Sequence, residues 1–249
     1  AWASDLPRAV ERGPVPSQAA ADAWARERTL GLIEEFPVEI DKLTRLLLAS
    51  ALATDISWSH PLEEDGGLLT LRDGTQLVAE TEAAGLVAVA APDSSSALAV
   101  FSVIAADDVS PHLVDRAAHE VALGTARPVP VTELEDGHAW TVSERREQRS
   151  GPDEQEEWQT WLPAWEARSD HDLAGAPGMA EVFATLSGFA RPEDQPVSFD
   201  ARQSAVASYT RTGFKAAAVT AVGLRAAGMP RFHDVLVRRV EVRFDRPYA

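Results

Sequence analysis

The sequence predicts an α+β fold, in which helices lie against hairpin-rich sheets. Capped segments with helical spacing alternate along the chain with short apolar runs and with stretches of period two. The 249 residues are 45% apolar, which provides for a sizeable core and excludes intrinsic disorder. Because neither a repeat nor a clear linker interrupts the chain, residues 1–249 are expected to form a single domain.

Helices are expected at three places. Residues 17–33 begin with Ser17 as a possible N-cap and carry apolar side chains at roughly helical spacing. Residues 110–124 begin with a Ser-Pro pair and stop at a glycine, which is the usual punctuation of a helix. A third, short helix is predicted over residues 179–189.

Strands account for most of the remaining patterns. Residues 46–53 form an apolar run interrupted by a single serine and flanked by polar residues, which predicts a central strand covered on both faces. Residues 66–101 contain short alternating segments, two of them around an Asp-Gly turn at 73–74, and predict hairpins. Further strands are expected over 160–173, where the strand enters a turn, and over 197–209.

Two segments have less usual compositions. Residues 144–157 are charged and polar, and we expect a solvated loop with strand edges. Residues 212–236 are rich in small side chains and match neither a good helix nor a normal surface loop. Read at period two, the face that begins with Phe214 is free of charge and suits burial in a sheet.

The charge balance limits the partners. With 23 Lys plus Arg and 39 Asp plus Glu the net charge is −16, so nucleic acid and anionic membrane surfaces are not expected to bind. No apolar run is long enough to cross a bilayer. The absence of Cys removes disulfides and thiolate chemistry, and it leaves the cellular compartment undetermined.

The sequence offers little support for catalysis or a cofactor. The serines at 94–96 lack the glycines of a nucleophile elbow, and no phosphate loop or dinucleotide fingerprint occurs. His112, Asp115 and His119 fall near one helical face, but without an H-E-x-x-H pattern a wet helix surface is the preferred interpretation. We therefore expect no metal, no cofactor and no enzyme; an unrelated α+β enzyme stays an alternative, which a cleft with a perturbed His or carboxylate would favour.

Several unusual segments together resemble the serpin family. The first helix carries Asp22-Ala-Trp24 and Thr29-Leu-Gly31, like the family helix that crosses the main sheet, and TRLLLASALATDISW resembles the central strand that follows. Leu162-Pro163-Ala-Trp165 is similar to a family strand, TGFKAAAVTAV to the proximal hinge of the reactive-centre loop, and Asp245-Arg246-Pro247 belongs to a segment like the strand after that loop. These segments occur in the family's order and cover nearly the whole chain.

The resemblance implies a large mixed or antiparallel main sheet, surface helices and an exposed reactive-centre loop. It implies a suicide inhibitor of serine proteases: the protease cleaves the loop, which then inserts into the main sheet as a new strand. The implied hinge residues are Gly213, Phe214, Lys215, Ala216, Ala217, Ala218, Val219 and Thr220. The implied reactive-site residues are Arg225, Ala226, Ala227 and Gly228, with cleavage after Ala227 by the family's loop length and after Arg225 as the competing site.

The departures from the family pattern leave alternatives open. Ser50 and Gln203 replace a family asparagine and histidine, so we predict a contact between them on adjacent strands, near Trp58 at the end of the central strand. Phe214 replaces a small residue, which is the best argument for a non-inhibitory binding or interaction protein of the same fold. Family segments before and after this chain have no counterpart, so we expect residues 46–53 and 240–244 to pack against segments outside it or against a companion chain.

Overall fold

The computed structural model describes residues 10–189, 199–214 and 232–249. The chain divides into two compact units that alternate along the sequence. The first unit contains the residues up to Thr54 and Glu166–Ala207, and the second contains Asp55–Trp165 and Ser208–Ala249. The single domain over 1–249 stays a prediction.

The first unit contains two of the three predicted helices. Helix α1 (Gln18–Arg28) begins where the sequence indicates, because the Ser17 hydroxyl accepts a hydrogen bond from the backbone N–H of Ala20 at 3.3 Å. Helix α3 (Met179–Phe189) coincides with the predicted third helix. Both helices rest on local signals and are confirmed, but α1 ends at Arg28, before the predicted end at residue 33.

The chain after α1 folds back onto the helix, and side chains of the helix accept hydrogen bonds from the backbone N–H groups of this returning segment. The Gln18 carboxamide oxygen accepts from the N–H of Ile40 at 2.8 Å, and the Asp22 carboxylate accepts from the N–H of Phe36 at 3.0 Å. The rings of Trp24 and Phe36 meet edge to face at 6.3 Å. This helical segment is therefore held by contacts within the first unit.

The central strand predicted over residues 46–53 is wrong in this structure. The residues lie outside every helix and strand, and the side chains of Leu48 and Leu52 are 63% and 91% exposed. An apolar run indicates that burial is favourable, but a strand also needs a neighbour that accepts its ladder hydrogen bonds. No described residue pairs with this run.

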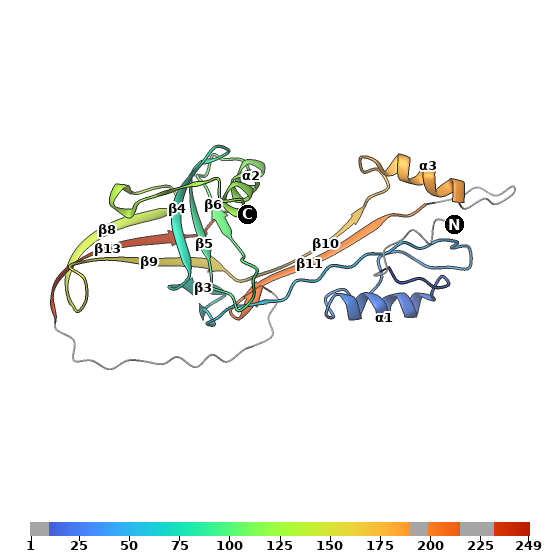
Figure 1. Ribbon diagram of the computed structural model, residues 1–249, viewed down its shortest axis with the longest axis horizontal. Helices are drawn as coiled ribbons and strands as arrows, with labels where there is room; N and C mark the ends of the chain where they lie inside the picture. Colours follow the sequence, from blue (N-terminus) through green and yellow to red (C-terminus); the bar gives the residue numbers. More distant parts are fainter. Residues whose placement is uncertain (1–9, 190–198, 215–231) are drawn as a thin grey trace. The chain divides into compact units, whose positions relative to one another are not determined.

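The second unit is built on sheets whose strands come from distant parts of the sequence (Figure 1). A five-stranded sheet has the order β2 (Glu63–Asp65), β3 (Leu68–Leu71), β9 (Glu154–Pro163), β13 (His233–Arg243) and β8 (Trp140–Arg149). A four-stranded sheet has the order β6 (Ser102–Ile104), β5 (Gly85–Ala91), β4 (Thr75–Thr81) and β7 (Arg127–Val129). A further sheet has the order β1 (Ile56–Ser57), β12 (Gly213–Phe214), β11 (Arg202–Thr210) and β10 (Trp165–Asp172), of which β1, β12, Trp165 and Ser208–Thr210 belong to the second unit.

The four-stranded sheet β6-β5-β4-β7 is buried on both faces. One face, with Val78 and Ile104, contributes to a core shared with the five-stranded sheet. The other face, with Val87 and Val103, packs against Val114 of helix α2 (Pro111–Ala122). Helix α2 confirms the second predicted helix, with proline in its first turn, and a short 3-10 helix (Val131–Glu133) follows β7.

The chain bends at Asp73 and Gly74, where a turn was predicted, but the hairpin expected around them is wrong. Strand β3 before the turn pairs with β9, whereas β4 after it pairs with β5 in another sheet. Gly74 has φ +107°, and a Cβ there would lie 2.5 Å from the carbonyl oxygen of Ala91. The glycine therefore lets the chain leave one sheet and enter the next at a close backbone approach.

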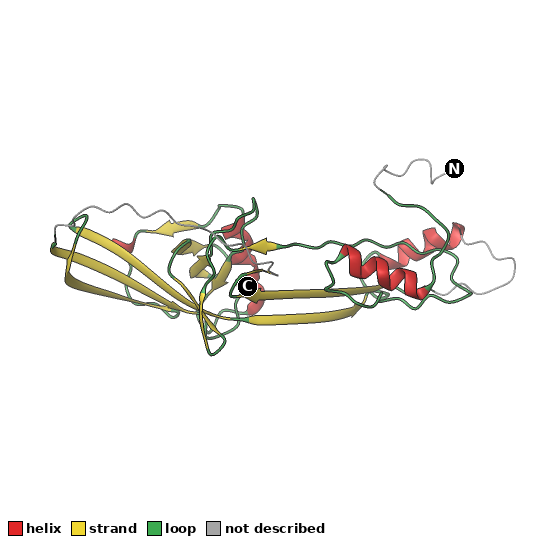
Figure 2. Ribbon diagram, turned by 90° about the horizontal axis from the view of Figure 1, so that it is seen from below, coloured by secondary structure: helices red, strands yellow, loops and turns green. Residues whose placement is uncertain are grey.

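The solvated loop predicted over residues 144–157 is also wrong. Most of these residues form β8 and the start of β9, which flank β13, antiparallel to β8 and parallel to β9 (Figure 1, Figure 2). Their charged side chains pair with one another across the strands, as Arg238 does with Glu144 at 2.6 Å. Strand pairing between distant segments overrides the polar composition.

The expectation that residues 240–244 pack against segments outside the chain is wrong as well. Val240, Val242 and Phe244 are buried in the core of the second unit, beside Leu162 and Trp140.

Across the described ranges, no helix combines the length and the apolar character that a membrane crossing requires.

Candidate functional site

The candidate site is the place where the predicted hinge begins, at strand β12. Gly213 and Phe214 form β12, which lies between β1 and β11 and is antiparallel to both. Phe214 faces Ile56 on one side and Tyr209 on the other. We call β1, β12 and residues 208–212, all of which lie in the second unit, the hinge base.

The turn from β11 into β12 is held by the segment that follows β1. The carbonyl of Thr212 accepts from the N–H of Trp58 at 3.0 Å, and the carbonyl of Arg211 accepts from the N–H of Leu62 at 2.8 Å. Within the turn, the Thr210 hydroxyl donates to the carbonyl of Gly213 at 2.9 Å. Three hydrogen bonds thus fix the backbone at the residue where the hinge starts.

Trp58 anchors the hinge base through its side chain. Its side chain is buried, and the indole Nε1–H donates to the carbonyl of Thr210 at 3.0 Å. Its ring lies 5.2 Å from the ring of Tyr209, which in turn stacks on Trp165 at 6.4 Å. Burial raises the pKa of the Tyr209 phenol, and the nearby Tyr248 phenol adds to this effect, so Tyr209 is neutral at physiological pH.

Phe214 has a defined place in this aromatic cluster. It is half-buried, and its ring meets that of Trp165 edge to face at 6.2 Å. Offset and edge-to-face contacts of this kind are favourable beyond simple area burial. The sheet therefore accommodates the bulky ring of Phe214 at the first position after Gly213, where the family has a small residue.

The other predicted site residues are not brought together in the same way. Ser50 is exposed and lies outside the strands, while Gln203 lies on β11 and is exposed. The prediction that they lie on adjacent strands is therefore wrong; a contact between their side chains, which no described hydrogen bond shows, stays a prediction. The remaining hinge and reactive-site residues lie outside the described residues: Lys215, Ala216, Ala217, Ala218, Val219, Thr220, Arg225, Ala226, Ala227 and Gly228.

Histidine side chains meet carboxylates at two places in the described ranges: His233 Nε2 lies 3.0 Å from Asp153 Oδ1, and His119 Nδ1 lies 3.9 Å from Asp115 Oδ2. On α2, His119 Nδ1 lies 2.8 Å from the carbonyl of Asp115, which is a contact within one helix. No group of three potential metal ligands occurs among the residues described. The pKa of the Glu157 carboxyl is held below its usual value mainly by a hydrogen bond from Arg149, which keeps it an ion-pair partner.

Comparison with known proteins finds similar structures but no similar sequences. No family model and no curated protein matches the chain. Among solved structures, thyroxine-binding globulin in complex with thyroxine matches over 93% of this chain and 58% of its own, with 12% identity and a TM-score of 0.50. Tengpin, a thermophilic serpin in its native state, matches over 93% of this chain and 57% of its own, with 12% identity and a TM-score of 0.50.

The chain has a serpin-like fold. It is a mixed α+β fold with several sheets and few helices, as the resemblance implied. The serpin-like chain spans less than two thirds of the length of these structures. The likeness therefore supports the architecture, and the activity has to be argued from the chain's own residues.

Sequence reasoning missed one feature of the serpin-like chain. Four charged side chains on β8, β9 and β13 (Glu147, Arg149, Glu157 and Arg239) form a ring of ion pairs, and a groove lies beside it. The signal is the mixed charges over residues 144–157, which without the strand register predict a solvated loop. Only the register of the strands reveals which charges meet.

Proposed function

We propose that the chain is a serpin-like inhibitor of serine proteases that acts as a suicide substrate. The segment after Phe214 serves as bait, and after cleavage it enters the sheet between β1 and β11 as a new strand. The proposal rests on one observation above all: Gly213 and Phe214 already occupy strand positions with a partner strand on each side.

The hinge base suits this task because it aligns the first residue to insert. The hydrogen bonds to Arg211, Thr212 and Gly213 fix the direction in which the chain leaves the turn. Edge-to-face packing on Trp165 favours the ring of Phe214 in the sheet position. Insertion would then extend an existing two-residue strand, which avoids the cost of starting a new one.

The experiment is incubation of the protein with a panel of serine proteases, followed by electrophoresis in SDS. An inhibitor gives a covalent complex that survives SDS. The variant Phe214→Pro removes a strand N–H and is expected to be cleaved without forming the complex, whereas the control Phe214→Leu keeps both the N–H and an apolar side chain. Cleavage by every protease with no complex from the wild type would contradict inhibition.

A second candidate is a non-inhibitory binding protein of the same fold. The likeness to thyroxine-binding globulin, whose structure holds thyroxine, supports this second candidate. The two functions differ in the thermal stability of the cleaved protein. Cleavage between Arg225 and Gly228 with a large rise in melting temperature supports an inserting loop, and cleavage with no rise supports the binding protein.

A further inference from the structure

Strand β9 has an open edge over half of its length. On one side β13 pairs with it from Glu154 to Trp161, but on the other side β3 pairs with it only from Thr160 to Pro163. The last β3 residue in this ladder is Leu71, after which the chain turns at Gly74 into another sheet. Residues Glu154–Gln159 therefore have a partner strand on one side only in the described structure.

The printed hydrogen bonds fix which backbone groups face this open edge. Leu236 N–H donates to the carbonyl of Asp153, and Phe244 N–H donates to the carbonyl of Trp161, both at 2.9 Å. In a parallel ladder the backbone groups of alternate residues point to the same neighbour, so the odd-numbered residues of β9 bond to β13. The N–H and C=O groups of Glu156 and Trp158 consequently point to the open edge.

The opposite side of β9 confirms this alternation independently. Ala164 N–H donates to the carbonyl of Gly67 at 2.8 Å, next to the pairs Leu69 with Leu162 and Leu71 with Thr160. Even-numbered residues thus bond to the β3 side. Glu156 and Trp158 continue that row beyond the end of β3, and a row of unpaired edge groups is a template for another strand.

A groove lies along this open edge, and we call it the β9 groove. It is lined by residues 156–159 on one side and by Arg72, Gly74 and Gln76 on the other, with Arg239 at its rim. Its volume of about 520 Å³ is within the range of sites that hold small ligands or short peptides. Gly74 contributes by turning the chain away where a straight β3 would have filled the space.

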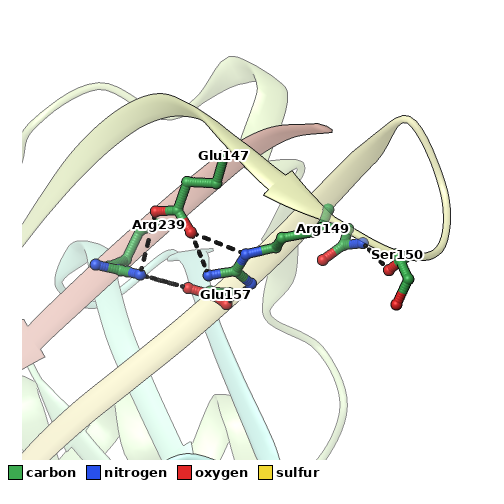
Figure 3. Close-up of polar contacts among 6 residues, drawn as sticks. Glu147, Arg149, Ser150, Glu157 and Arg239 are labelled. Atoms are coloured by element: carbon green, nitrogen blue, oxygen red, sulfur yellow. Dashed lines mark hydrogen bonds and ion pairs between the residues drawn. The ribbon is translucent and has the colours of Figure 1, made fainter. Parts of the chain in front are cut away.

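The rim of the groove is fixed by the ring of ion pairs shown in Figure 3. Arg149 donates to Glu147 at 2.6 and 2.8 Å and also to Glu157. Arg239 donates to Glu157 at 2.8 Å and lies 3.9 Å from Glu147. The charges of Glu157 and Arg239 are therefore satisfied within the ring and need no further partner.

The charge left for an incoming segment is negative. Glu156 shares a strand face with Trp158, because the side-chain period of a strand is two, and with Arg238, its register partner on β13. Arg238 interacts electrostatically with Glu156 but is paired with Glu144 at 2.6 Å, so Glu144, Glu156 and Arg238 together keep a negative charge. Arg72 has a partner in Glu63, at 3.4 Å. The net charge of −16 adds a long-range attraction for basic segments.

We propose that the β9 groove binds an extended basic segment of a partner protein, which adds to the sheet antiparallel to β9 and in line with β3. Its backbone pairs with the N–H and C=O groups of Glu156 and Trp158, as in strand addition at other sheet edges. An apolar side chain lies opposite Trp158, and a basic side chain two residues later lies opposite Glu156. The proposal stands apart from protease inhibition and does not depend on it.

The first test measures binding of a fluorescent, end-blocked peptide with the core Val-Thr-Lys by anisotropy. We expect binding to weaken by about tenfold or more when Lys is replaced by Glu, when the backbone amides are N-methylated, or when the protein carries Glu156→Lys. The matched control is Glu154→Lys, an equal charge change on the same strand outside the groove lining, which should bind within about twofold of the wild type. Equal weakening by both variants, or unchanged binding of the methylated peptide, would overturn the proposal.

The second test needs no variant. Amide hydrogen exchange is expected to be fast at Glu156 and Trp158 in the free protein, because their N–H groups face the open edge, and slow at Glu157, which bonds to β13. Saturating peptide should slow exchange at Glu156 and Trp158 by about tenfold or more and leave Glu157 unchanged. Protection of Glu156 and Trp158 without peptide, or no change with it, would refute the open edge.

Discussion

Replacing Trp58 by Phe tests whether this side chain holds the hinge base. The indole is 2% exposed and donates to the carbonyl of Thr210 at 3.0 Å. Loss of that hydrogen bond costs about 1 kcal/mol, and the carbonyl left without its donor adds to this. The smaller ring leaves roughly 40 Å³ unfilled, which at about 24 cal/mol per Å³ costs a further ~1 kcal/mol. We expect a free energy of unfolding lower by about 2–3 kcal/mol.

The assay is urea denaturation followed by circular dichroism, with limited proteolysis at the hinge measured in parallel. Since the lost indole bond holds the carbonyl of Thr210 at the start of the hinge base, the variant should be cleaved after the hinge base faster than the wild type. The control is Trp161→Phe, because Trp161 is half-buried and its ring carries the Arg243 guanidinium at 4.4 Å. That variant should lose only about 1 kcal/mol or less. Equal losses at the two tryptophans would refute the anchoring role of Trp58.

Three further perturbations follow from local geometry. Because Arg149 lowers the pKa of Glu157, the ion pair stabilises the fold above pH ~4.3, and this contribution is lost as the pH falls through the lowered pKa. Glu157→Gln should therefore lower the free energy of unfolding by about 1 kcal/mol or less at pH 7. In thermal melts at acid pH, the difference between the variant and the wild type should vanish. Gly74→Ala should lower the free energy of unfolding by at least about 2 kcal/mol, since its Cβ would lie 2.5 Å from the Ala91 carbonyl oxygen at φ +107°, and urea titration against wild type measures it. Ser17→Ala removes the N-cap acceptor of α1 and should cost about 1 kcal/mol in a thermal melt, whereas no loss would show that the cap is unimportant.

The helices could be predicted from the sequence because their signals are local. The cap at Ser17 and the proline in the first turn of α2 act within a few residues of the backbone groups that they affect. Strands over 66–101 could be recognised by alternation, but their partners could not. The chain at 73–74 turns between two sheets rather than within a hairpin, because the partner of β3 is β9, far away in sequence.

The candidate site was predicted only where a family pattern singled out its residues. Gly213 and Phe214 were expected at the start of the hinge, and the structure gives them partners on both sides. The contact of Phe214 with Trp165 could not be predicted, since it joins residues from separate strands. The ion-pair ring was missed for the same reason: Arg149 and Glu157 are close in the chain, but Arg239 reaches them only through the register of β13.

Two segments of the described chain share a lack of strand partners, yet they lead to different conclusions. Residues 46–53 expose Leu48 and Leu52 without a neighbouring ladder, so nothing fixes the direction, phase or charge of what would cover them. The open edge of β9 has a known phase, because bonds at both of its ends define which N–H and C=O groups are unpaired. Gly74 and Glu156 both line the groove beside this edge, and Glu156 brings a negative charge to it. An edge whose backbone phase and charge are both determined specifies the strand that can join it, whereas an apolar run alone specifies only that burial is favourable.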